Sequence, residues 1–140
     1  VYKRQGGKLR REAIPELFYF AEPAPFGFLE GIGWRDVLGA MRELTQLLKR
    51  GWDPNRIFFL LVSQVRALIL ARAALEGEPL PGGPDWLWRR RLQQARNFTK
   101  KELLELLSSL QELDLKIKQG QMDPVSALYL FTLRLAPVPP

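Results

Sequence analysis

The side chains that could carry chemistry in this chain of 140 residues are carboxylates, lysines, arginines and aromatic rings, because the sequence contains neither Cys nor His. Zinc fingers, disulfide frameworks, Cys nucleophiles and Ser-His-Asp triads are therefore excluded, since each needs a thiolate or an imidazole. A high-affinity metal site built on His or Cys is excluded for the same reason. We expect no metal in this chain.

The carboxylates have local structural explanations. Glu102 completes a capping box with Thr99, and Asp53 and Asp123 each precede a proline as helix N-caps. The outer face of a helix accounts for Glu105, Glu112 and Asp114. No carboxylate pair is left for general acid–base catalysis, and no Gly-rich phosphate loop is present. We therefore expect no turnover, no nucleotide binding and no cofactor.

One cluster of aromatic and basic residues, at positions 86–96, has the side chains that nucleic acid needs. Tryptophan rings can stack on unpaired bases while guanidinium groups neutralise phosphates. We expect Trp86 to lie in the core, whereas for Trp88 core packing and base contact both remain open. The arginines at 89–91 are expected on the outer side of a helix. The DNA-contact candidates are Trp88, Arg89, Arg90, Arg91 and Arg96.

A second basic run lies near the start of the chain and contains Lys3, Arg4, Lys8, Arg10 and Arg11. Such a run can follow a nucleic-acid backbone, but a solvated chain end is the commoner case and is our expectation.

Helix signals dominate the rest of the sequence and predict an all-α fold, a compact bundle of about five helices. Apolar spacings of three and four, with caps and terminal glycines, predict helices from about Trp34 to Lys49, Pro54 to Glu76, Asp85 to Asn97, Lys100 to Gly120 and Pro124 to Leu135. Shorter helices are expected at 9–18 and 26–32. In the first long helix the expected apolar face is Trp34, Val37, Leu38, Met41, Leu44 and Leu48, with Arg35, Arg42, Glu43 and Lys49 pointing away.

The overall composition is that of one soluble domain with a basic bias. Hydrophobic residues make up 46% of the chain and the formal net charge is +6. The most apolar run, Ile57 to Leu75, is interrupted by polar and charged residues, whereas a membrane span needs about 20 mostly apolar residues. It predicts a buried helix. No secretory leader is recognisable, so we expect a cytoplasmic location.

Several of these helix junctions, read in order, resemble the C-terminal domain of the DNA polymerase III delta subunit. Ser63-Gln64-Val65-Arg66-Ala67-Leu68 with Leu75-Glu76-Gly77 is similar to its Q-x-R-x-L helix, and Gln94-Ala95-Arg96-Asn97-Phe98-Thr99 to its Q-A-R-R-F-[ST] junction. Its closing segment resembles Leu113 to Lys118, Gly120, Asp123-Pro124, Ala127-Leu128 and Leu133-Arg134-Leu135. The loop at 78–84 departs from the family, being shorter and rich in Pro and Gly, and so do Pro23 and Pro25.

The resemblance implies a domain division and a role. Residues 9–18 look like the last helix of a preceding domain, and Phe26-Gly27-Phe28-Leu29-Glu30 like the start of the helical collar. We therefore expect residues 1–22 to be a tail and linker and 23–140 to be the collar domain, excised from a longer protein because the first residue is Val1. The collar domain packs beside those of other loader subunits, of the gamma/tau and delta prime types. The sliding clamp is then contacted only through an N-terminal domain absent here.

Gln64 and Arg66 are the candidates for such a subunit interface. An unpaired buried polar group costs about 1 to 3 kcal/mol, so each needs a partner or an exposed face. The alternative is a solvated stripe or an internal pair with Asp114 or Glu112. The alternative for the whole chain is a small basic helical domain that binds nucleic acid directly.

Overall fold

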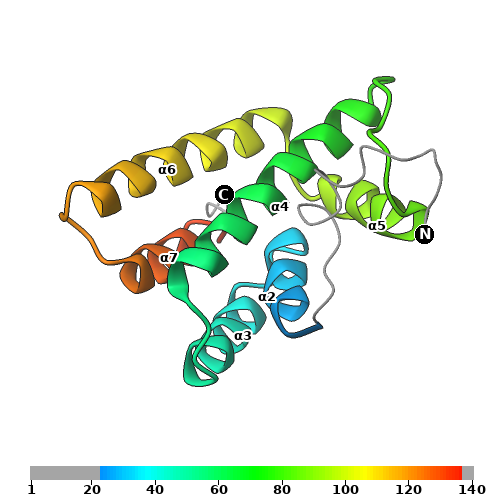
Figure 1. Ribbon diagram of the computed structural model, residues 1–140. Helices are drawn as coiled ribbons and strands as arrows, with labels where there is room; N and C mark the ends of the chain where they lie inside the picture. Colours follow the sequence, from blue (N-terminus) through cyan, green and yellow to red (C-terminus); the bar gives the residue numbers. More distant parts are fainter. Residues whose placement is uncertain (1–22, 137–140) are drawn as a thin grey trace.

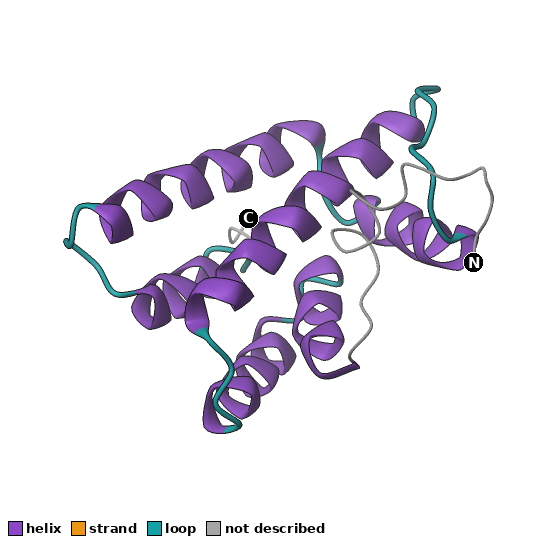
Figure 2. Ribbon diagram, viewed as in Figure 1, coloured by secondary structure: helices purple, strands orange, loops and turns teal. Residues whose placement is uncertain are grey.

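The structure is a computed structural model that describes residues 23–136. These residues form six helices and no strand, which confirms the predicted all-α class (Figures 1 and 2). The helices are α2 (Pro23–Gly33), α3 (Val37–Lys49), α4 (Pro54–Ala74), α5 (Asp85–Ala95), α6 (Lys100–Lys118) and α7 (Pro124–Leu133). The helix predicted at 9–18 and the basic run beside it lie outside the described residues.

Helix α4 is the longest of the six, with 21 residues, and it runs through the middle of the bundle (Figure 1). It packs against α2, α5, α6 and α7. Leu61, Val65 and Leu68 are fully buried, as the sequence predicts. By length and composition α4 could cross a membrane, but 56% of its most apolar window is buried inside the bundle, as in the core helix of a soluble protein.

The predicted N-caps are confirmed at three helix starts. The Asp53 carboxylate accepts a hydrogen bond from a backbone N–H of the first turn of α4, and Asp123 does the same for α7. At α6 the Thr99 hydroxyl accepts from the Glu102 N–H at 3.0 Å while the Glu102 carboxylate accepts from the Thr99 N–H at 2.8 Å, a complete capping box. Helix α5 begins at Asp85, as predicted, but it has no side-chain cap, because Pro84 stands at the N-cap position.

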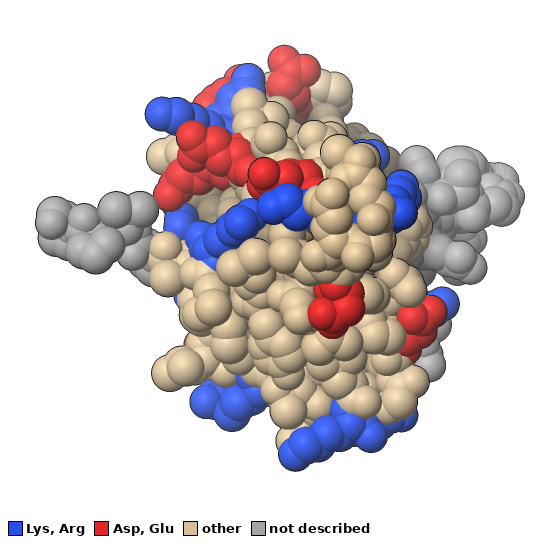
Figure 3. All heavy atoms as spheres, turned by 90° about the vertical axis from the view of Figure 1, so that its left-hand side faces the viewer, with Lys and Arg blue, Asp and Glu red and all other residues tan. Residues whose placement is uncertain are grey.

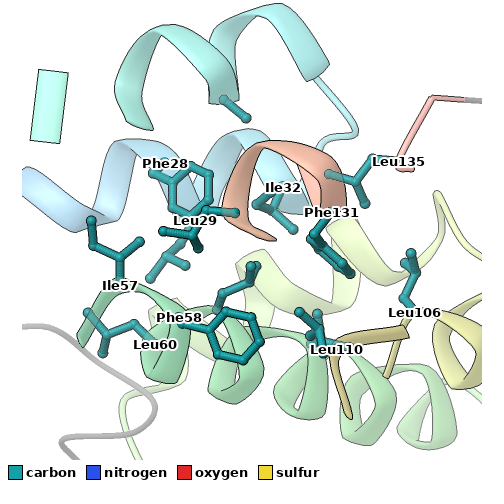
Figure 4. Packing of buried hydrophobic residues seen from close by; sticks show 14 of the residues in the cluster. Phe28, Leu29, Ile32, Ile57, Phe58, Leu60, Leu106, Leu110, Phe131 and Leu135 are labelled. Atoms are coloured by element: carbon teal, nitrogen blue, oxygen red, sulfur yellow. The ribbon is translucent and has the colours of Figure 1, made fainter. Parts of the chain in front are cut away.

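The main core lies where α2, α3, α4, α6 and α7 meet (Figure 4). Helix α2 contributes Phe28, Leu29 and Ile32, while α4 contributes Ile57 and Phe58 among others. The aromatic ring of Phe131 on α7 fills the space facing α6. A smaller cluster joins α4 to α5 through Ala67, Ala71, Trp88 and Ala95.

Helix α3 begins three residues later than the spacing suggests. Its first residue is Val37, with Asp36 as N-cap, and Trp34 lies in the turn after α2 with 40% of its surface exposed. The buried residues of α3 are Ala40, Leu44 and Leu47, while Leu38 is 71% exposed. The predicted face is therefore right for Leu44, and Val37 and Leu48 also pack against the core, but the prediction is wrong for Leu38. Ala40 is buried in addition, where α2 approaches closely: a Cβ on Gly31 would lie 3.0 Å from it.

Arg35, predicted to point away from the bundle, instead ties three segments together. Its φ is +57°, so the chain turns sharply and sends the guanidinium inward. This group donates to the carbonyl of Leu135 at 3.2 Å, to the carbonyl of Asn97 at 3.0 Å and to Glu102 at 3.1 Å. It also lies 4.7 Å from the centre of the Phe98 ring. The α2–α3 turn is thereby fixed to the α5–α6 junction and to the end of α7.

Replacing Leu68 with Ala should lower the free energy of unfolding by about 2 to 5 kcal/mol, because the side chain is fully buried and its loss leaves a cavity. Chemical denaturation followed by circular dichroism measures this. The exposed Leu104 on α6 provides the control, and Leu104→Ala should change stability little. Equal losses in the two variants would contradict the central position of α4.

The Glu102 carboxylate makes the stability of the folded domain depend on pH, and its lowered pKa gives the direction of that dependence. The Thr99 N–H and the Arg35 guanidinium lower the pKa of this carboxyl from its ordinary 4.5. Its contribution to stability is therefore complete above 4.5 and is lost as the pH falls through the lower folded-state pKa. Glu102→Gln should be less stable than the wild type at neutral pH, with a gap that closes in strong acid. Thermal melts across that range check this, and a gap that widens in acid would refute it.

Candidate functional site

Helix α5 carries most of the DNA-contact candidates, and the structure divides them between two faces. Arg89, Arg90 and Arg96 are exposed, as predicted. Arg91 was expected beside them but is only 1% exposed, and Trp88 is only 3% exposed. The reason is the helical period: the buried residues Leu87, Trp88, Arg91, Gln94 and Ala95 form one stripe facing α2 and α4. Neither Trp88 nor Arg91 can therefore meet a base or a phosphate.

The prediction for Trp86 is wrong, and the question left open for Trp88 is decided in favour of the core. Trp86, expected in the core, is 52% exposed, and its ring lies against the Phe26 ring of α2, at 6.2 Å between centroids. Trp88 instead turns inward, and its indole N–H donates to the Gly82 carbonyl at 3.4 Å. A Cβ at Gly83 would come within 3.3 Å of that nitrogen. The Pro and Gly residues of the 78–84 loop thus let the chain close over the Trp88 ring.

Arg91 is a buried cation that contributes to packing inside the domain. Its guanidinium lies 5.3 Å from the centre of the Trp88 ring, and the negative charge of Glu30 on α2 attracts it. Burial lowers the pKa of Arg91 to about 9, and the negative charge of Glu30 opposes that change. At neutral pH the group therefore remains charged inside the bundle.

Glu30 on α2 connects the exposed and the buried sides of α5. One carboxylate oxygen accepts from the Gln94 amide at 2.9 Å, and the other accepts from the Trp34 indole N–H at 3.3 Å and pairs with Arg90. The Arg90 guanidinium also lies 5.7 Å from the centre of the Trp34 ring. Arg90 is thus held against α2, while its side chain is still 45% exposed. The sequence offers no sign of this network, because its members lie about 60 residues apart.

Gln64, predicted at a subunit interface, is used inside the domain. It is 3% exposed, and its amide donates to the Leu29 carbonyl of α2 at 3.1 Å. The internal pair weighed for it is also wrong, since Glu112 lies near Arg134 and Asp114 pairs with Lys118. A buried amide here satisfies a backbone carbonyl of α2 and fixes that helix on α4.

Arg66, the other interface candidate, lies on the outer face of α4. Phe59 and Leu70 stand on the same face, seven residues before and four residues after it, and are 56% and 39% exposed. These three residues form what we call the α4 outer face. The hydrophobic periodicity of the sequence could not reveal the α4 outer face. Because α4 carries apolar residues on all sides, its sequence shows no difference in hydrophobicity between a face in the core and a face in solvent.

The distribution of charge over the surface is uneven. On the side of the molecule that lies at the left in Figure 1, charged side chains gather toward the upper and lower edges, and a broad area between them carries almost none (Figure 3). In the described residues no group of three or more Asp and Glu side chains is placed to hold a metal ion.

Known proteins match this chain in sequence and in fold. Residues 85–135 match the family model of the DNA polymerase III delta subunit, C-terminal domain. The fold is similar to that of the Bacillus subtilis DNA clamp loader delta protein, YqeN, with a TM-score of 0.65 and 24% sequence identity over 80% of this chain. The match covers 35% of YqeN, so this chain spans about a third of that protein. No curated protein matches the sequence.

The two comparisons concern different extents of the chain. The family match contains α5, α6 and α7, with the Thr99 capping box and the Asp123 cap, while the fold match extends over most of the described helices. Residues 85–135 are thus similar in sequence to the C-terminal domain of the DNA polymerase III delta subunit, and the fold is similar to that of a clamp-loader delta protein, which confirms the predicted resemblance.

Proposed function

We propose that residues 23–140 are a collar domain, which assembles with other clamp-loader subunits so that a sliding clamp is loaded on primed DNA. The observation that carries this proposal is the family match of residues 85–135, which contain half of the described helices. The fold similarity to a clamp-loader delta protein supports it. The partners are subunits of the gamma/tau and delta prime types, and the role is a scaffold without catalysis or cofactor. Its location is the cytoplasm, and residues 1–22 are the tail of a preceding domain.

The α4 outer face is the contact surface in this proposal. Aromatic and arginine side chains dominate the binding energy of protein interfaces, especially when apolar neighbours exclude water around them. Phe59, Arg66 and Leu70 provide that combination on a helix whose other sides are fixed by the core. The position is therefore rigid before a partner binds, which lowers the entropy that binding costs.

The alternative for the whole chain, a free-standing basic domain that binds nucleic acid, does not explain the match of residues 85–135. We therefore treat nucleic-acid binding as a property of one surface and not as the identity of the domain.

A double variant, Phe59→Ser with Arg66→Ala, tests the proposed interface. Both side chains are exposed, so the variant should keep the melting temperature of the wild type within a few degrees. Its affinity for gamma/tau and delta prime type subunits, measured by size-exclusion chromatography and calorimetry, should fall about 30-fold or more, as for the loss of a hot spot of about 2 kcal/mol.

The matched control is Leu38→Ser with Arg42→Ala, which removes the same kinds of exposed side chain from α3. This control should assemble like the wild type. If the α4 variant also assembles like the wild type, the α4 outer face is not the interface; if the wild type binds neither kind of subunit, the proposed function itself is wrong.

A further inference from the structure

Within the described residues 23–136 the positive charge is concentrated at one place. Residues 85–101 contain six basic residues and one acidic residue, a net charge of +5, whereas the described residues together contain 16 basic and 12 acidic residues, a net charge of +4. This stretch comprises α5 and the first turn of α6. Of its basic residues only Arg91 is buried. The exposed ones are Arg89, Arg90, Arg96, Lys100 and Lys101.

Four of these five cations have no carboxylate partner among the described residues. Some other basic side chains have one, such as Lys118 with Asp114 and Arg72 with Glu76. Arg90 is paired with Glu30. The unpaired ones are Arg89, Arg96, Lys100 and Lys101, so their charge is available to a ligand from outside the domain.

Trp86 stands at the start of this basic face. It lies three residues before Arg89 and four before Arg90, which places the three side chains on the same side of α5. Its ring is 52% exposed, while the Phe26 ring supports it from α2. A large aromatic ring left half in water, next to free cations, is the arrangement that proteins use to stack on an unpaired base.

We propose that the outer face of α5 and the first turn of α6 bind single-stranded DNA. Arg89, Arg96, Lys100 and Lys101 contact the phosphates, and Trp86 stacks on a base. Charge complementarity selects a polyanion, and the exposed ring selects a single strand, because the bases of a duplex are already stacked on one another. The site is separate from the α4 outer face and does not depend on assembly with other subunits.

Binding of a fluorescein-labelled oligothymidine of 20 nucleotides to the 140-residue chain, measured by anisotropy at several salt concentrations, tests this site. Each phosphate neutralised on a single strand contributes about −0.7 to the slope of log K against log salt. Arg89→Ala with Arg96→Ala should therefore reduce the slope by about 1.4 and weaken binding about 25-fold at 0.1 M salt. Lys49→Ala with Arg50→Ala removes the same charge from α3 and the residue after it, and should change both quantities little.

A second variant separates stacking from charge. Trp86→Ala should weaken binding of the oligothymidine about 5-fold or more, without a change in the salt slope and without loss of the fold. A duplex of the same length should bind more weakly and be indifferent to this change. Three results would overturn the proposal. The first is that the α5 and α3 double variants weaken binding of the oligothymidine equally, and the second is that polyglutamate competes as well as unlabelled oligothymidine while Trp86→Ala has no effect. The third is that the duplex binds as tightly as the single strand. The first of these would assign the binding to another basic segment, and the second would assign the face to an acidic protein.

Discussion

The burial of α4 is the constraint on which the rest of the structure depends. This helix is apolar on nearly every side, so it is stable in water only when other helices surround it. Helices α2, α5, α6 and α7 all pack against it, and α3 is added through its close packing on α2. The side left uncovered is the narrow strip with Phe59, Arg66 and Leu70. The same constraint that builds the core therefore leaves the α4 outer face in contact with water.

Polar links then fix the order of the surrounding helices. Gln64 holds the Leu29 carbonyl of α2, Arg35 joins the α2–α3 turn to the α5–α6 junction, and Glu30 holds α5 through Gln94 and Arg90. Gln64 and Glu30 thereby satisfy two buried polar groups, the Leu29 carbonyl and the Gln94 amide, that would otherwise lack a partner. Between them they set the rotation of α5, which keeps Trp88 and Arg91 inside and leaves Trp86 and Arg89 outside.

The parts of this arrangement that could be predicted are those with a local cause. The Thr99–Glu102 capping box and the proline after Asp53 act within one turn, so the sequence is enough to place the starts of α6 and α4. The rotation of a short helix has no such local cause. Trp86 and Trp88 are chemically alike and two residues apart, and the packing of α5 on α4 together with the 78–84 loop decides that Trp88 is the buried one. The inward turn of Arg35 likewise needs a positive φ that its residue type does not suggest.

The central claim is that the α4 outer face meets another member of a clamp loader, and site-specific photo-crosslinking tests it most directly. A photoreactive residue at position 70 or, as the comparison, at the exposed position 38 of α3 would be placed in the chain, and the chain would then be mixed with gamma/tau and delta prime type subunits. The account predicts crosslinks from position 70 to one of those subunits and none from position 38. A loader that assembles but gives crosslinks only from position 38 would contradict it.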